Sequence, residues 1–92
     1  MKIENERLSL TISAYAAEMH SLIDKHDSKE ILWQGDPAFW AGRNPILFPI
    51  IGSTFDKKIH LFDRIYEMGN HGFARHSEFE FTAATSDSIS LR

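Results

Sequence analysis

Short stretches in which apolar and polar residues alternate, separated by polar turns, constrain the fold of this chain more than any other feature. The alternation is clear over residues 8–12, 78–82 and 89–91. A period of two sends successive side chains to opposite faces of a β-strand, so each stretch fits a half-buried strand. Several such strands joined by turns are typical of an all-β sandwich or barrel.

Turn residues indicate where further strands begin and end. Residues 59–62 and 65–68 flank Asp63-Arg64 in a way that predicts a β-hairpin. The polar residues 25–29 predict a turn, because they include few apolar side chains and favour reversal of the chain. After this turn, Ile31-Leu32-Trp33 predicts a short strand.

The remaining segments are less regular. From residue 12 to residue 23 the apolar side chains recur at helical spacing, which by itself favours a helix. Gly35-Asp36-Pro37 is typical of a turn, and Phe39-Trp40 after it fits a single helical turn. The apolar segment 43–52 contains two prolines, which donate no ladder hydrogen bonds, so this segment cannot be a central strand throughout.

The composition argues against several classes of protein. The 92 residues carry a net charge of −3 and form no basic stripe, so nucleic acid is not an expected partner. The longest apolar run, residues 45–51, is too short to cross a membrane. The charged N-terminus precedes no apolar segment, which argues against a signal peptide, and the lack of cysteine fits a reducing compartment. We therefore expect a cytoplasmic protein.

The segment Asn70-His71-Gly72-Phe73-Ala74-Arg75 carries the residues best suited to a ligand site. His71 can both donate and accept hydrogen bonds, whereas Arg75 only donates. Gly72 lies between them and permits backbone angles that other residues avoid. This combination suits a polyhydroxylated ligand, although the residues alone define no more than a polar site.

Two other segments, taken together with this polar site, give the chain a family resemblance. They are Leu32-Trp33-Gln34-Gly35-Asp36-Pro37 and Arg43-Asn44-Pro45-Ile46-Leu47-Phe48-Pro49-Ile50-Ile51-Gly52. Together with residues 70–75 they resemble the start of the aldose 1-epimerase (galactose mutarotase) family, in its LacX-like branch. The resemblance covers essentially the whole chain, but only the N-terminal part of a much longer family sequence.

This resemblance implies a particular fold. It predicts an all-β chain that forms the N-terminal part of a galactose mutarotase-like β-sandwich (supersandwich), truncated, with residues 1–92 as the N-terminal portion of a single domain. Over residues 12–23 it implies two strands with a bend near residues 14–17, and we adopt this prediction in place of the helix. The alternating residues 89–91 run to the end of the chain, which also favours truncation.

The resemblance also implies roles for three residues. His71 would lie in the sugar cleft and hydrogen-bond the substrate near its reacting end. Arg75 and Arg43 would bind the substrate as donors to sugar hydroxyls or, through the guanidinium fork, to a phosphate. Two alternatives stay open, because Arg75 could pair with Glu78 or Glu80 at the surface and Arg43 could be a solvated loop cation.

We expect no catalytic pair within these residues. Mutarotation needs one group that protonates the ring oxygen and another that removes the proton of the anomeric hydroxyl. In the family these groups are a second histidine and a glutamate, both beyond residue 92. A further cleft arginine of many family members is replaced here by Ser53. The sequence therefore predicts a fragment of an aldose 1-epimerase-like isomerase, which interconverts the α and β anomers of an aldose in carbohydrate metabolism. We expect this fragment to be inactive alone. The alternative is a non-catalytic carbohydrate-binding or interaction module.

The expected partner is a small-molecule sugar, and open strand edges predict self-association. Neither a cofactor nor a metal is expected, because the chain has no zinc-ligand spacing, glycine-rich phosphate loop or nucleophile elbow. Large aromatic side chains usually pack in the core. Most of the following are therefore expected to be buried: Trp33, Phe39, Trp40, Phe48 and Phe73.

Overall fold

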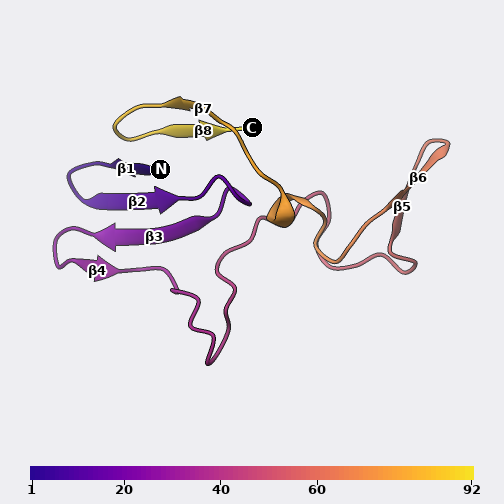
Figure 1. The fold of residues 1–92 in the computed structure, drawn as a ribbon, viewed down its shortest axis with the longest axis horizontal. Coiled ribbons are helices and arrows are strands. Elements are labelled where there is room, and N and C mark those ends of the chain that lie inside the picture. The colour runs from indigo at the N-terminus through magenta and orange to yellow at the C-terminus, as the bar shows by residue number, and fades with distance from the viewer.

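The computed structural model describes all residues from 1 to 92 and confirms the predicted all-β class. Figure 1 shows three separate groups of antiparallel strands, joined by long irregular segments. The only helical element is a one-turn 3-10 helix, η1, at Ala74–His76. No helix has the length and apolar composition required to cross a lipid bilayer. The strands are β1 Lys2–Glu4, β2 Leu8–Ile12, β3 Met19–Asp24, β4 Lys29–Glu30, β5 Lys58–Leu61, β6 Arg64–Glu67, β7 Phe81–Ala84 and β8 Ile89–Leu91.

The largest sheet contains β1, β2, β3 and β4 in chain order, and all neighbouring strands are antiparallel. Leu10 of β2 lies opposite Ile3 of β1 and Leu22 of β3, so branched aliphatic side chains line up across three strands. The best-buried residues of this sheet, Ser9 and Ile12, both belong to β2. The predicted strand at residues 8–12 is therefore confirmed, and it forms the centre of the sheet.

A left-handed bend between β2 and β3 replaces the helix that periodicity alone favours over residues 12–23. Ala16 and Ala17 have φ angles of 60° and 47°, which a right-handed helix does not permit. The bend is held by the chain near residue 78, because the Ala16 amide donates to Ser77 O (2.7 Å) and the Phe79 amide donates to Ala14 O (2.9 Å). The two strands and bend implied by the family resemblance are confirmed, and a long-range pairing has overridden the local helix preference.

The two remaining groups of strands are hairpins. In the β5–β6 hairpin Leu61 pairs with Arg64, so the turn residues are Phe62 and Asp63 rather than the predicted Asp63-Arg64. Phe62 has a φ of 54°, a left-handed angle that closes this two-residue turn. The β7–β8 hairpin confirms the predicted strand at 89–91, and its pairing continues through two backbone hydrogen bonds between Glu80 and Arg92 (2.8 and 2.9 Å).

The prediction of a strand at Ile31-Leu32-Trp33 is wrong, because the strand β4 comprises Lys29–Glu30, and only the Ile31 amide continues its pairing, with Leu22 O (2.8 Å). The Glu30 carboxylate, rather than a backbone carbonyl, accepts the next hydrogen bonds along this edge. It accepts hydrogen bonds from the amides of Leu22 (2.8 Å) and Leu32 (3.0 Å), and from the hydroxyl of Ser21. A side chain therefore terminates the edge of the sheet at this point. Phe39 and Trp40 lie on one turn as expected, because Asp36 O accepts hydrogen bonds from the amides of Phe39 (3.0 Å) and Trp40 (2.9 Å), and the turn does not continue into a helix.

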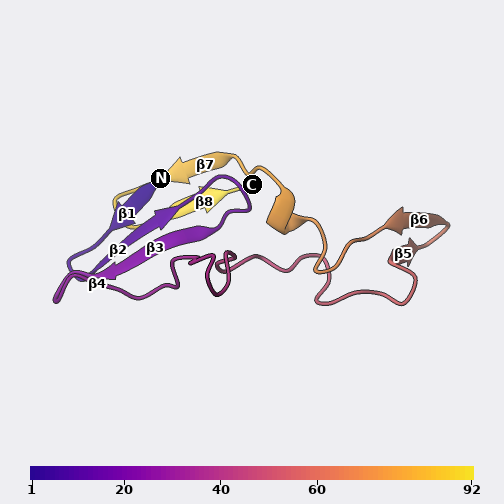
Figure 2. The ribbon, with the colours of Figure 1, turned by 60° about the horizontal axis from the view of Figure 1, so that its bottom comes forward.

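The molecule is thin and open. Its extents are 52 × 35 × 15 Å, and its radius of gyration is 16.4 Å, against about 12 Å for a compact domain of this length. The accessible surface is 6937 Å², whereas a compact monomer of this mass would expose about 5,500 Å². Figure 2 shows the same extended arrangement from another direction, with the β5–β6 hairpin far from the other strands. Only six residues of the 92 are buried, so this chain by itself forms little core.

The aromatic residues expected in the core are instead exposed, from 43% for Trp33 to 82% for Phe39. They contact one another in edge-on pairs, with ring centroids 6.3 Å apart for Trp33 and Phe39 and 6.1 Å apart for Phe48 and Phe73. No second layer of this chain packs over these rings, which is why the expectation is wrong for these 92 residues.

We predict that the purified chain associates with itself, because exposed apolar faces and open strand edges are removed from water by pairing. Size-exclusion chromatography with light scattering should give a mass above 10.6 kDa that rises with concentration. Ile65→Lys, which places a charge on the exposed face of β6, should reduce the association. A monodisperse monomer that melts cooperatively would contradict this prediction.

A second prediction concerns acid stability. Hydrogen bonds from Ser21 and then from the amides of Leu22 and Leu32 lower the pKa of Glu30 below its ordinary value of 4.5. A lowered pKa in the folded state means that this carboxylate stabilises the fold above pH 4.5, and that the contribution is lost as pH falls through the folded-state pKa.

We therefore expect Glu30→Gln to lower the melting temperature at neutral pH and to reduce its further fall in acid. Glu78→Gln is the matched control, because the Glu78 side chain is exposed and makes no hydrogen bond. Thermal melts followed by circular dichroism at several pH values would test this. Identical pH profiles for wild type and Glu30→Gln would rule out the role assigned to Glu30.

Candidate functional site

His71 is held in place by Gly52 through both its backbone and its side chain. The His71 amide donates to Gly52 O (2.7 Å), and the Gly52 amide donates to His71 Nδ1 (2.8 Å). Because Nδ1 accepts a hydrogen bond, the neutral ring carries its proton on Nε2. His71 also has a left-handed φ of 64°, an angle at which histidine is enriched among non-glycine residues. The ring is therefore fixed in one orientation, with Nε2–H free to donate to a ligand.

Gly72 allows the next part of the chain to lie directly against Phe48. Its φ is 73°, and a Cβ atom at this position would overlap the Phe48 carbonyl group and approach Pro49 Cδ to 2.7 Å. The close approach lets the Phe48 carbonyl accept hydrogen bonds from the amides of Phe73 (2.9 Å) and Ala74 (3.3 Å). Only glycine fits both the angle and the space, so residue 72 fixes the position where η1 begins.

Arg75 lies in η1, next to the bend between β2 and β3. The hydroxyl of Ser77 donates to Phe73 O (2.9 Å) across the turn of this helix, and the carbonyl of Ser77 accepts from the Ala16 amide. These two bonds join η1 to the bend. Arg75 is half-buried and makes no hydrogen bond or ion pair within the protein. Its alternative pairing with Glu78 or Glu80 is not formed, since the Glu80 carboxylate pairs with Arg92 at 2.8 Å.

Arg43 is brought to the same region by its neighbour Asn44. The Asn44 side-chain amide donates to Met19 O (2.7 Å) and accepts from the Met19 amide (3.1 Å), so it pairs with the start of β3 as another strand would. Arg43 itself is half-buried, and its Nη1 donates to His20 O (3.0 Å). These contacts tie Arg43 to the folded chain, so the solvated-cation alternative does not describe it.

Arg43 and Arg75 line one cavity of about 330 Å³, although 32 positions separate them in the sequence. The cavity lies between the β2–β3 bend, the loop around residue 42 and η1. His71 does not line it, so the structure joins two of the three predicted site residues, and the third lies against Gly52, four positions before Arg75 in the sequence. The other lining residues are Tyr15, Ala16, Glu18, Trp40, Gly42, Pro45 and His76.

Glu18 is a site residue that the sequence analysis missed. It is the only carboxylate that lines the cavity, and its side chain is 19% exposed. One carboxylate oxygen accepts from the Asn44 amide (3.2 Å) and the other lies 3.3 Å from His20 Nε2. No local pattern in the sequence identifies Glu18, because it reaches the cavity only through the left-handed bend that precedes it.

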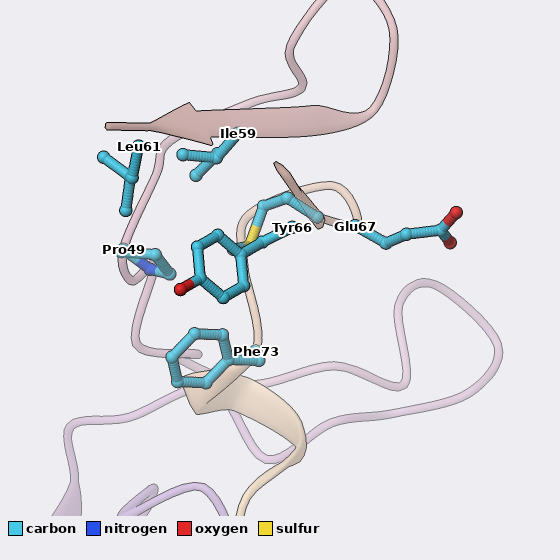
Figure 3. Close-up of a pocket in the computed structure, with 7 residues that line it drawn as sticks. Pro49, Ile59, Leu61, Tyr66, Glu67 and Phe73 are labelled. Atoms are coloured by element: carbon cyan, nitrogen blue, oxygen red, sulfur yellow. The ribbon is translucent and has the colours of Figure 1, made fainter. Parts of the chain in front are cut away.

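A second hollow, of about 590 Å³, has a different character. Figure 3 shows the ring of Tyr66 between Phe73 and the side chains of Ile59 and Leu61, while the carboxylate of Glu67 points away. Pro49 and Met68 complete the lining. The surface offers few hydrogen-bond donors, which a sugar requires, and it resembles half of a hydrophobic core. We therefore place the candidate site in the cavity of Arg43 and Arg75, and we keep His71, four residues before Arg75, as a further candidate.

We predict that Gly72→Ala destabilises the chain by at least about 2 kcal/mol, because it combines backbone overlap with a left-handed φ. Gly69→Ala is the matched control, since a Cβ atom there meets nothing within 4 Å, and it should change stability by about 0.5 kcal/mol or less. Urea denaturation measures both. Hydrogen exchange should also show lost protection of the Phe73 amide in Gly72→Ala, and equal stability of the two variants would contradict the prediction.

Comparisons with known proteins relate this chain to a longer group of bacterial proteins. No family model matches it. Over 96 aligned positions it is 37% identical to the chromosomal protein LacX of Lactococcus lactis, and the match covers 99% of this chain and 32% of LacX. The plasmid-encoded LacX of the same organism is 36% identical with the same coverage. The chain therefore spans about a third of the length of the curated relatives it matches.

Two solved structures share its fold. One is described as a galactose mutarotase-related enzyme from Lactobacillus acidophilus, with 35% identity and a TM-score of 0.90 over 99% of this chain and 30% of that one. The other is a galactose mutarotase-like protein from Lactobacillus casei, with the same identity and TM-score and 31% of that chain covered. The predicted resemblance is confirmed: this chain is a homologue of LacX and of galactose mutarotase-related proteins, and it matches about a third of their length.

Proposed function

We propose that this chain supplies part of the sugar cleft of an aldose 1-epimerase-like protein, an isomerase that interconverts α and β anomers of an aldose in carbohydrate metabolism. The observation that carries the proposal is the convergence of Arg43 and Arg75 on one cavity. The His71 ring, held by Gly52 with Nε2–H free, lies four positions before Arg75 in the sequence. The homology to galactose mutarotase-related proteins supports the same conclusion. In this proposal residues 1–92 are the N-terminal portion of one domain, and the protein acts in the cytoplasm.

The chemistry of the cavity suits a single sugar ring. Its volume of about 330 Å³ lies at the lower end of the range of about 300–1,000 Å³ that ligand pockets occupy. Two guanidinium groups offer several fixed donors to hydroxyl oxygens, and the Trp40 and Tyr15 side chains offer apolar surface for the carbon face of a sugar. His71 adds one donor of defined direction.

Catalysis of mutarotation requires a separate acid and base, and the only carboxylate that lines the cavity is already engaged. The carboxylate of Glu18 is engaged with Asn44 and His20, so both of its oxygens already have partners. The family resemblance assigns the acid to a second histidine and the base to a glutamate, both outside residues 1–92. We therefore propose that these residues bind and orient the sugar, and that the proton transfers take place on groups from the remainder of the fold.

The engaged state of Glu18 also supports the second candidate function, a non-catalytic carbohydrate-binding module. A module of this kind would use the same arginines and the same histidine without any acid or base. The two candidates differ in one measurable respect, because only the first gives accelerated mutarotation once the rest of the fold is present.

We predict that the isolated chain binds an aldose and does not accelerate its mutarotation. Titration of the chain at micromolar concentration with galactose or glucose should change its intrinsic fluorescence, and the change should disappear in Trp40→Phe. His71→Ala should weaken binding by several-fold, since one hydrogen bond contributes about 0.5–1.5 kcal/mol.

His26→Ala is the control for His71→Ala, because His26 lies in the exposed turn between β3 and β4. Polarimetry on freshly dissolved α-galactose and α-glucose should give the buffer rate. Faster mutarotation that disappears in His71→Ala would overturn the assignment of the acid and base to other parts of the fold. Equal binding by wild type and His71→Ala, with matched melting curves, would leave His71 with a structural role only.

A further inference from the structure

We propose that Glu18 is a positioning residue of the sugar site, which sets the place of Arg43 in the cavity without itself binding the sugar. The inference rests on the proposed function and adds to it a residue that acts through another. It follows from the way in which residues 18–20, where β3 begins, hold the irregular loop of residues 33–47.

The loop of residues 33–47 contains no strand that could fix its position. Apart from one bond to the residue just before it, its hydrogen bonds to the rest of the chain all end on residues 18–20. The carbonyl of His20 accepts two of them, from Gln34 Nε2 (3.1 Å) and from Arg43 Nη1 (3.0 Å). Because so few contacts hold the loop, each of them has a large influence on where Arg43 lies.

Asn44 is the part of the loop that Glu18 holds. Its backbone amide donates to one Glu18 carboxylate oxygen (3.2 Å), and its side chain pairs with both backbone groups of Met19 (2.7 and 3.1 Å). Backbone pairing cannot continue past this point, because Pro45 has no N–H to donate. Side chains therefore take the place of the next ladder bonds, and Arg43 is fixed through its neighbour.

The second oxygen of Glu18 supports Arg43 by another route. It lies 3.3 Å from His20 Nε2, and the carbonyl of His20 is the group that accepts from the Arg43 guanidinium. The Glu18 side chain thus contacts both the residue that follows Arg43 and the residue that binds its guanidinium. Only 19% of this side chain is exposed, so water is a poor substitute for these contacts.

Two other roles for this carboxylate fit the contacts less well. A residue that neutralised the arginines of the cavity would form an ion pair with one of them, and Glu18 forms none with Arg43 or Arg75. A general base needs an oxygen that is free to take a proton from the substrate, whereas both oxygens of Glu18 already have partners. The contacts therefore favour positioning.

Hydrogen exchange of the 92-residue chain tests the position of the loop. We expect Glu18→Ala to lose protection of the Asn44 amide, which donates to the carboxylate, and to keep that of the Phe73 amide, which donates to Phe48 O outside the loop. Glu18→Gln should retain part of the Asn44 protection, because its amide oxygen can still accept. Glu6→Ala is the matched control, since Glu6 is exposed and makes no ion pair.

Titration with galactose tests whether Glu18 acts through Arg43. Intrinsic fluorescence should show several-fold weaker binding by Glu18→Ala, comparable to the loss of one hydrogen bond, and partial recovery in Glu18→Gln. A double-mutant cycle separates positioning from a general loss of structure. The variant that combines Glu18→Ala with Arg43→Gln should bind no more weakly than Arg43→Gln alone, because the carboxylate acts only by placing the arginine.

The outcomes separate this inference from the function on which it rests. Unchanged protection of the Asn44 amide in Glu18→Ala would overturn the inference, and so would losses of affinity that add in the double variant. An equal loss of protection at Phe73 would also overturn it, since Glu18 would then support the fold as a whole. A wild-type chain that binds no galactose would contradict the proposed function, and exchange at Asn44 would still decide whether Glu18 holds the loop of Arg43.

Discussion

The close approach of Gly72 to Phe48 is the contact on which the rest of the structure depends. It brings two irregular segments together at a point where no sheet joins them, through two hydrogen bonds to a single carbonyl group. η1 begins immediately after this contact, and the bonds of Ser77 then attach η1 to the β2–β3 bend. The position of the Arg75 backbone therefore depends on Gly72, three residues earlier, because only a residue without a side chain can approach Phe48 this closely.

The stability of this arrangement is unevenly distributed. The four-stranded sheet and the two hairpins are held by local antiparallel pairing, whereas the sheet meets the β7–β8 turn through a single hydrogen bond from the Glu4 amide to Ser86 O (2.8 Å). The fold nevertheless superposes on galactose mutarotase-related structures with a TM-score of 0.90, over 30% of their length. In those larger proteins further chain is available to cover the apolar hollow around Tyr66 and the exposed aromatic rings. The open faces of these 92 residues are thus consistent with a surface that belongs inside a larger sandwich.

The proposed separation between groups that bind the sugar and groups that transfer protons follows from the same geometry. In the proposed function the binding groups are the two arginines and His71, which come from the loop around residue 43, from η1 and from the turn against Gly52. Such groups orient a ligand without taking part in proton transfer, and orientation alone accounts for a large share of enzymatic rate enhancement. Glu18 has the chemical character of a general base, but its hydrogen bonds commit it to positioning the Arg43 loop.

The sequence by itself determined the all-β class, the strands at residues 8–12 and 89–91, the turn that follows β3 and the β5–β6 hairpin, because these features depend on local alternation and turn residues. It did not predict that β8 pairs with β7, and the alternating residues 78–82 form a strand only from Phe81. It also identified Arg43, Arg75 and His71 as ligand-binding candidates through the family resemblance. Local patterns misplaced the strand after the Lys25 turn, because beyond the Ile31 amide the Glu30 carboxylate binds the backbone amides of Leu22 and Leu32 in place of further strand pairing.

Only the tertiary structure decided where the site lies and what lines it. The helical periodicity of residues 12–23 gives way to a bend because Ala14 and Ala16 pair with the chain near Glu78, more than 60 residues away. That bend brings Tyr15 and Glu18 into the lining of the cavity together with Arg75. Contacts between residues so far apart in the sequence cannot be predicted from local patterns. Only the folded chain therefore shows that Arg43 and Arg75 line the same cavity.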